Sequence, residues 1–433
     1  MGGHGASLVL RVGSSAVLTR LLDVEVYGLL ELVWVFMTGL QLFSDLGLNV
    51  AVVQSEKGDK EDFLNVVWTL NCIRGGVIWV GAALGAIPMA LFYETPALAV
   101  LLPVAALTAV LDGFNATSLM TQTRRLNQGP LIRLEVSVQV ITAIVQIAVA
   151  MVWPSPWAIV VGTICGSAFR LFSSFFFFKT FRHRFHFDRQ VARELFNFGR
   201  WIFLATLVTF ISSQGDRMLL GKLMDLSYLG VYAIAGRLSL ALESVMKRIS
   251  SSVIFPMFSE AIREHAKRED ARPEELAGLL NRARLRSDLA FMVPAGMLIV
   301  LGELVVRIIY DPRYLDAGYV LQIMAIRTAL GNIVIPCEAF FLAGGDSRFG
   351  FWRSLLQAGA VLIGVPIGYA IGDFWGIVWA IGLSGAPVVI YVWFALIRRG
   401  IFRLTIELRS FGFLLVGLGL GYLVDQALRT LFF

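Results

Sequence analysis

Residues 215–230 read GDRMLLGKLMDLSYLG, and this stretch decides how the rest of the chain is interpreted. It places an acid and a base, Asp216 and Arg217, inside an otherwise apolar segment. A charge near the centre of a lipid bilayer costs roughly 2.5–3.5 kcal/mol, so it requires a partner or a water-filled cavity. The stretch therefore predicts a polar site within a membrane helix.

The same stretch has a counterpart near the start of the chain. Residues 18–28 repeat two leucines, the aspartate and the final glycine of residues 220–230 at the same spacing, with a basic residue at the third position of both copies. Each copy follows the first apolar segment of one half of the chain, which indicates an internal repeat. Six helices separate the copies, so we expect halves of parallel topology, related by a pseudo-two-fold axis along the membrane normal.

Composition places the chain in the membrane. Of its 433 residues, 57% are hydrophobic and only 16% are charged, whereas soluble domains carry about 25% charged residues. The apolar runs have the length of helices and lack the alternation of barrel strands. We therefore predict an all-α polytopic membrane protein. The net charge of +6 is attributed to cytoplasmic loops, and no nucleic-acid partner is expected.

The apolar runs predict two sets of six membrane spans and a thirteenth. The fold expected is two parallel-topology six-helix bundles around a central cavity, plus a C-terminal helix. The domains are an N-terminal bundle (1–178), a basic cytoplasmic linker (179–195), a C-terminal bundle (196–397) and the additional helix (398–433). The predicted spans are 5–22, 27–53, 63–93, 97–121, 130–152, 156–178, 196–220, 226–257, 284–310, 315–343, 348–372, 375–397 and 410–428.

Lysine and arginine set the expected orientation. Most of them fall in one alternate set of predicted loops, which places the N-terminus in the cytoplasm. In the linker 179–195, basic residues alternate with phenylalanines, so it either lies on an anionic lipid surface or is a solvated connection. The other long loop, 259–286, contains a helix start at Pro273 and is assigned no chemistry.

Charged residues inside the spans are the candidate site. Arginine keeps its charge at any depth, and its fork of donors suits phosphate oxygens. Alternatives stay open: small-residue stripes also form packing seams, Asp216 could be a proton or sodium site, and Asp45 could mark a helix break or cap. The candidate anion-binding residues are Arg217, Arg237, Arg327 and Arg11, and the candidate charge-balancing or ion-coupling residues are Asp216, Asp45, Glu31 and Asp112.

Catalytic patterns are missing from the sequence. It has no glycine-rich nucleotide loop followed by Lys-Ser/Thr, no Ser/His/Asp set on one membrane side and no cluster of metal ligands. Its three cysteines are dispersed in apolar spans, which argues against a disulfide framework. We therefore expect a protein that is not an enzyme, with no cofactor and no bound metal.

Several segments resemble bacterial oligosaccharide flippases of the Wzx type. This family lies within the multidrug/oligosaccharidyl-lipid/polysaccharide (MOP) exporter superfamily, and the resemblance covers nearly the whole chain. The segments that carry it are 18–22, 27–29, LFSDLGLNVAVVQ at 42–54, GDRMLLG at 215–221, LGVY at 229–232, FPMFS at 255–259 and AFFLAGG at 339–345. Relatives usually carry more residues before the first helix, so a longer N-terminus is an open expectation.

The resemblance implies transport. It implies that a lipid-linked sugar diphosphate moves to the outer leaflet by alternating access, in a bacterial cytoplasmic (inner) membrane. The implied partners are this oligosaccharide, membrane lipids, a polysaccharide polymerase and export machinery. A drug or small-cation exporter of the same superfamily is the main alternative and would favour acidic cavity walls. A membrane-embedded polymerase would need a large extracytoplasmic loop with acid and base residues, and the predicted loops on that side are short.

The sequence yields one prediction about export. Arg217→Ala and Arg237→Ala should each abolish polysaccharide export, because each removes a charge that would contact the substrate phosphates. Export is measured in cells whose membrane levels of the variants match the wild type. Normal export from both variants would refute the assignment of these residues.

Overall fold

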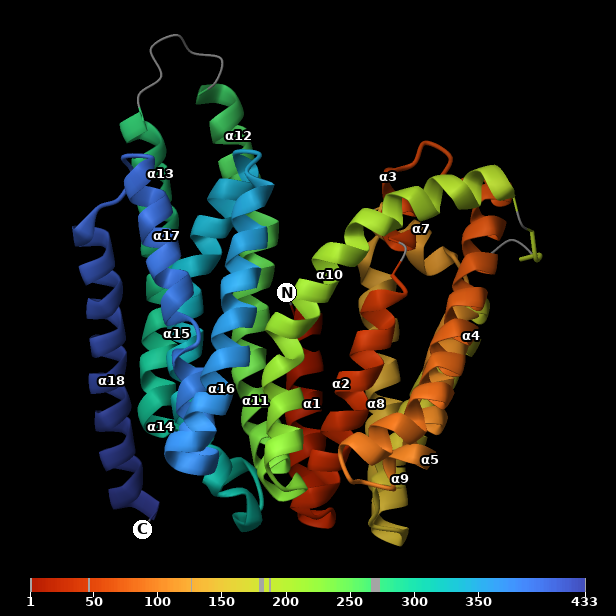
Figure 1. Ribbon diagram of the computed structural model, residues 1–433, viewed down its shortest axis with the longest axis horizontal. Helices are drawn as coiled ribbons and strands as arrows, with labels where there is room; N and C mark the ends of the chain where they lie inside the picture. Colours follow the sequence, from red (N-terminus) through yellow and green to blue (C-terminus); the bar gives the residue numbers. More distant parts are fainter. Residues whose placement is uncertain are drawn as a thin grey trace. The chain divides into compact units, whose positions relative to one another are not determined.

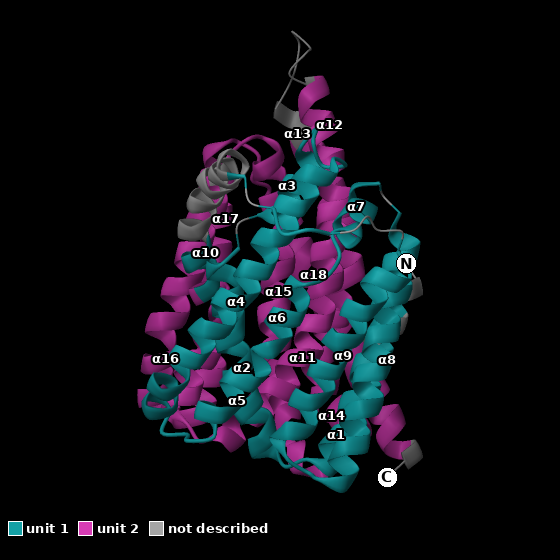
Figure 2. Cartoon of the chain, turned by 90° about the vertical axis from the view of Figure 1, so that its right-hand side faces the viewer, with its two compact units in different colours: residues 1–210 teal, residues 211–433 magenta. Residues whose placement is uncertain are grey.

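The computed structural model describes residues 2–45, 47–125, 127–178, 183–186, 188–265 and 273–432. Every regular element within these ranges is helical, as predicted. The chain forms two compact units, residues 1–210 and 211–433 (Figure 2). The predicted domain boundaries after residues 178, 195 and 397 stay a prediction. The two units meet at residue 210 instead, within the helix Arg189–Leu223.

Unit 1 begins with two long helices and contains a bent pair. Its helices are α1 (Gly2–Leu21), α2 (Val24–Phe43), α3 (Leu48–Gln54), α4 (Glu61–Phe92), α5 (Leu98–Ala105), α6 (Leu107–Gly113), α7 (Ser118–Arg124), α8 (Gln128–Val152), α9 (Pro156–Phe176) and the first part of α10 (Arg189–Leu223) (Figure 1).

Unit 2 is built around α15, the candidate span with the largest buried share. After the rest of α10, its α-helices are α11 (Leu226–Ile249), α12 (Phe255–His265), α13 (Pro273–Ser287), α14 (Val293–Ile309), α15 (Asp316–Ala343), α16 (Ser347–Leu383), α17 (Ala386–Arg398) and α18 (Leu404–Phe432). Two π-helical turns, η1 (Ser250–Ile254) and η2 (Asp288–Met292), join α11 to α12 and α13 to α14, and a short 3₁₀ turn, η3 (Pro312–Tyr314), precedes α15.

Nine helical segments of the described residues are long and apolar enough to cross a membrane, and a bent pair raises the number to ten. The multi-pass membrane character is thus confirmed. One of the nine, 348–398, contains two predicted spans, which meet at the non-helical residues Gly372 and Asp373. The predicted loop 259–286 is largely helical, and α13 begins at Pro273 as expected.

Two predicted spans are broken where side chains take over backbone hydrogen bonds. The span 97–121 bends by 63° between α6 and α7. There Ser174 Oγ accepts the Ala116 amide (3.0 Å), and Trp68 Nε1 donates to the Phe114 carbonyl (3.2 Å). The span 27–53 is interrupted before α3, where Gly47 has φ of 66°. Irregular backbone at membrane depth persists only where its polar groups are satisfied.

The described part of the predicted linker contacts unit 1. Residues 183–186 lie against α4, where the Arg184 amide donates to Asn65 Oδ1 (2.9 Å) and the His186 amide donates to Thr69 Oγ1 (3.0 Å). The Phe185 ring lies 4.8 Å from that of Trp68. These four residues are therefore held by protein groups. The remaining linker residues up to 182, together with 187, lie outside the described residues.

The last helix packs closely on α14. A Cβ added to Gly417 of α18 would overlap the carbonyl oxygen of Val293, and one added to Gly296 of α14 would overlap that of Leu414. Glycine is required at both positions because the two backbones touch. Such small-residue contacts are a main means of joining helices in lipid. The thirteenth predicted helix is thus an integral part of unit 2 (Figure 1).

This contact predicts a stability difference between two glycines of α18. Gly417→Ala should destabilise the protein by roughly 1–3 kcal/mol, because the new methyl group overlaps the Val293 carbonyl. Gly419→Ala is the matched control, since a Cβ there meets nothing within 4 Å. Thermal unfolding of the purified protein in detergent measures both variants. Equal melting temperatures would contradict the close contact.

Candidate functional site

Asp216 on α10 is the centre of a buried polar cluster in unit 2. Its Oδ2 accepts hydrogen bonds from Tyr232 Oη on α11 (2.5 Å) and from Arg327 Nη1 on α15 (3.1 Å). Its Oδ1 accepts the Arg217 amide (2.9 Å). Three helices thus converge on one carboxylate. We call Asp216, Arg217, Tyr232 and Arg327 the Asp216 cluster.

The two arginines of the cluster are placed differently. The Arg217 side chain turns back along α10, where its Nη1 donates to the Ser213 carbonyl (3.1 Å) and to Gln214 Oε1 (3.2 Å). The Arg327 side chain is 29% exposed, whereas that of Asp216 is 3% exposed. Arg327 is therefore the member of the cluster that can contact a ligand while it stays paired.

The charges of the cluster do not cancel. One carboxylate lies beside two guanidinium groups, and Tyr232 adds a neutral hydroxyl, so these four residues carry a net positive charge. Glu243 of α11 also interacts electrostatically with Arg327, and it is itself paired with Lys247 (2.6 Å). A buried carboxylate needs such donors, because its desolvation costs several kcal/mol. The excess positive charge and the exposed face of Arg327 suit an anion, and phosphate oxygens match the guanidinium fork.

The other predicted residues lie elsewhere. Arg237 is half-buried on α11, within unit 2, where the cluster's Tyr232 also lies. Arg11 is exposed on α1, and Glu31 is half-buried on α2. The exposed Asp45 accepts the Gly47 amide (2.9 Å) at the break between α2 and α3. The exposed Asp112 on α6 accepts a bond from Asn115 Nδ2 (3.4 Å). The structure therefore gathers Asp216, Arg217 and Arg327 in one cluster, and the roles of all eight residues stay predictions.

Unit 2 contains a second buried polar network, which was not predicted from the sequence. Arg284 of α13 donates from Nη1 and Nη2 to the carboxylate of Glu407 on α18, and also from Nη2 to Ser410 Oγ (3.1 Å). Ser410 Oγ donates to Asp288 Oδ2 (2.7 Å), and Asn332 Nδ2 donates to Asp288 Oδ1 (3.2 Å). All five side chains are buried. We call these residues the Asp288 network.

Tyr232 was also not predicted as a site residue. It lies 16 residues after Asp216, on the next helix of the chain. The signal available was one hydroxyl among several in an apolar segment, which is weak. No group of three or more His, Cys, Asp or Glu side chains in the described ranges is arranged to hold a metal ion.

Solved membrane transporters have the same fold. Across 99% of this chain and 98% of the other, it matches the lipid II flippase MurJ in an inward closed conformation, with a TM-score of 0.72 and 14% sequence identity. It also matches an inward-facing multidrug resistance MATE family transporter of the MOP superfamily, with a TM-score of 0.70, 12% identity and coverage of 91% and 94%. The chain therefore shares the fold of these two transporters.

The family follows from the sequence of residues 17–319, which match the polysaccharide biosynthesis protein family. The chain belongs to this family. It is 21% identical over 317 residues to the teichuronic acid biosynthesis protein TuaB of Bacillus subtilis, covering 72% of this chain and 63% of the relative. It is 23% identical over 207 residues to the amylovoran biosynthesis protein AmsL of Erwinia amylovora, covering 48% and 51%. The chain thus spans between half and two thirds of the length of these relatives.

The Asp216 cluster predicts strong coupling between two charges. Asp216→Asn should destabilise the protein by about 3–5 kcal/mol, because it leaves the paired guanidinium without its counter-charge. The double variant Asp216→Asn/Arg327→Gln should recover part of this loss. A double-mutant cycle of unfolding measurements tests the coupling. Simple additivity of the two single variants would show that the pair contributes nothing.

Proposed function

We propose that this protein is a flippase for a lipid-linked oligosaccharide. It moves a polyprenyl diphosphate sugar from the cytoplasmic to the outer leaflet by alternating access, as a non-enzymatic step in polysaccharide export. Membership in a polysaccharide biosynthesis family and the MOP transporter fold support this role. The observation that carries it is the Arg327 guanidinium, which is held inside a membrane helix by Asp216 and yet is partly exposed.

The chemistry of the substrate fits this arrangement. A diphosphate is the anionic part of a lipid-linked sugar, and it must pass a low-dielectric region where an unpaired charge is costly. A positively charged cluster on a central helix lowers that cost by providing donors along the path. An exporter of cations would meet repulsion at the same place. We therefore rank the drug or small-cation exporter second.

The orientation and surroundings belong to the same proposal. The distribution of lysine and arginine supports a cytoplasmic N-terminus in a bacterial inner membrane. The linker 179–195 would then lie on the cytoplasmic side. The partners proposed are the lipid-linked oligosaccharide, the surrounding lipids, and a polymerase with export machinery that consumes the flipped product.

The decisive experiment is flipping by reconstituted protein. In proteoliposomes with a fluorescent polyprenyl diphosphate oligosaccharide, Arg327→Gln should lower the flipping rate about 10- to 100-fold, since a charged hydrogen bond contributes roughly 1.5–3 kcal/mol. Arg327→Lys should lie in between, because it keeps the charge but loses the fork.

The control is Arg313→Gln. Arg313 is also paired with an aspartate, Asp311 (2.9 Å), but it lies in the short connection before α15. The Arg313→Gln variant should flip lipid at the wild-type rate. Wild-type flipping by Arg327→Gln would remove Arg327 from the site. Wild-type protein that transports cationic dyes and does not flip the lipid would favour the exporter.

A further inference from the structure

Three neighbouring helices of unit 2 lose regular α-helical bonding. The π turn η1 is followed by Pro256, and the π turn η2 is followed by Pro294. The helix α15 contains Pro336. Proline has no amide hydrogen and crowds the carbonyl four residues before it, so helices bend there. π turns inside helices are rare and occur frequently at functional sites.

The three breaks lie at one level. Both η1 and η2 contact α15. Pro336 leaves the carbonyl of Asn332 without its usual amide donor, and the side chain of Asn332 donates to Asp288, the first residue of η2. The break in α15 therefore touches the break between α13 and α14.

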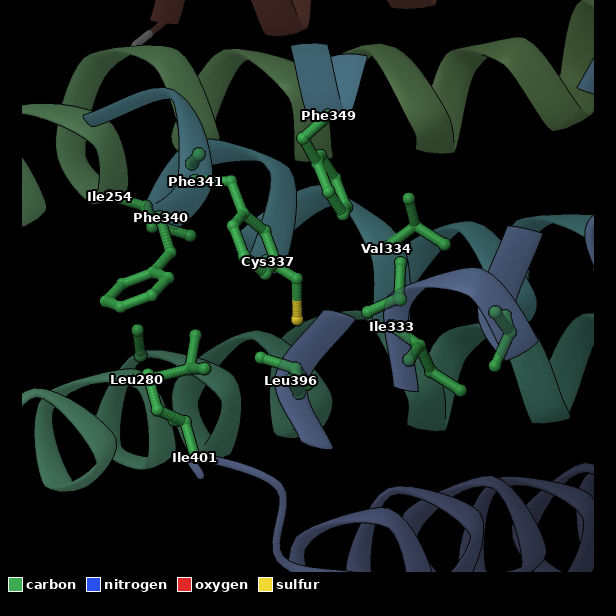
Figure 3. Close-up of a cluster of buried hydrophobic side chains, with 14 of the residues drawn as sticks. Ile254, Leu280, Ile333, Val334, Cys337, Phe340, Phe341, Phe349, Leu396 and Ile401 are labelled. Carbon is green, nitrogen blue, oxygen red and sulfur yellow. The ribbon is translucent and has the colours of Figure 1, made fainter. Parts of the chain in front are cut away.

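Around this level the helices share one buried hydrophobic cluster. It includes Leu280 of α13, Phe340 of α15 and Leu396 of α17 (Figure 3), together with Phe258 of α12. The cluster extends one helical turn past the breaks, to Ala295 of α14 and Ala329 of α15. The rings of Phe258 and Phe340 lie 5.3 Å apart. Dense packing transmits displacement as a unit and resists internal deformation. We call α12, α13 and the part of α15 after Pro336, which this cluster joins, the end body.

The helix α18 passes the level without a break and is fixed on both sides of it. Near its start, Glu407 and Ser410 join the Asp288 network, and further along, Gly417 touches α14. Buried ionic networks contribute little net stability, because desolvation offsets their attraction, but they can specify one geometry. The Asp288 network thus lies where the end body meets the remaining helices.

We propose that unit 2 bends at this level, like a hinge. The Asp288 network, which we call the pin, fixes the angle between the end body and the remaining helices. The end body moves as one piece relative to α14 and the first part of α11. A kink of about 20° on an arm of the length of α12, roughly 16 Å, displaces its tip by about 5 Å. The role of this motion rests on the proposed function, in which the bend would open the cytoplasmic side of the flippase.

Distances between spin labels test the hinge without any transport assay. Cysteines at the exposed positions Glu264 on α12 and Ile308 on α14 carry nitroxides, with Cys72, Cys165 and Cys337 replaced by alanine. Ser410→Ala removes two bonds of the pin, the one from Arg284 and the one to Asp288, and should shift or broaden the Glu264–Ile308 distance by about 5 Å. The pair Tyr228–Ile308, which lies wholly beyond the hinge, should not change. Ser259→Ala is the matched control, because its hydroxyl bonds only along α12.

The outcomes separate the hinge from the flippase. If Ser410→Ala and Asp288→Asn leave the Glu264–Ile308 distance unchanged in monodisperse protein, the hinge is refuted. An equal change in the Tyr228–Ile308 distance also refutes the hinge, because it would show that the whole of unit 2 has become less ordered. The alanine at Ser410 is a small change, so it gives an answer even where Asp288→Asn fails to fold. A mobile hinge in protein that flips no lipid leaves the hinge standing and contradicts the proposed function.

Discussion

A carboxylate that cannot reach water must find its donors within the protein, and this constraint organises unit 2. Asp216 is buried at the junction of α10, α11 and α15, and it receives one donor from each. Apolar surfaces give helices in lipid no reason to prefer one neighbour over another, because the lipid tails are equally apolar. Hydrogen bonds to a buried charge, in contrast, favour one neighbouring helix over another. Asp216 therefore helps to fix which three helices meet and in which register.

Much of the fold could be predicted, because hydropathy reports directly on burial in lipid. The predicted span 130–152 differs from α8 by two residues at its start, and 315–343 differs from α15 by one. The break between α6 and α7 was not predictable. The carbonyl of Phe114 and the amide of Ala116 are satisfied by Trp68 and Ser174, which are 46 and 58 residues away in the sequence. A window of local hydropathy contains no information about such distant partners.

Three of the four members of the Asp216 cluster were named from the sequence, but their pairing was not. Asp216 and Arg217 stand out as charges in an apolar run, yet adjacent residues on a helix do not face each other. The carboxylate therefore takes its guanidinium partner from α15, 111 residues away. The Asp288 network was missed for a related reason. Arg284 lies in an arginine-rich segment that resembles a cytoplasmic loop, and its partner Glu407 is 123 residues further along the chain.

The two polar clusters differ in what surrounds them, and this difference bears on movement. The Asp216 cluster lies where α11 and α15 are regular, so a change of angle there would break bonds to a buried charge. The Asp288 network lies beside two π turns and a proline, where the backbone already lacks regular partners. Packed interiors change shape by switching between discrete arrangements, and hinges concentrate that change in a few residues. At the broken level, hydroxyl and amide groups such as those of Ser410 and Asn332 can exchange partners as the angle changes. A membrane bundle can therefore keep one rigid charged site and still bend, provided that the bend occurs where its helices are already interrupted.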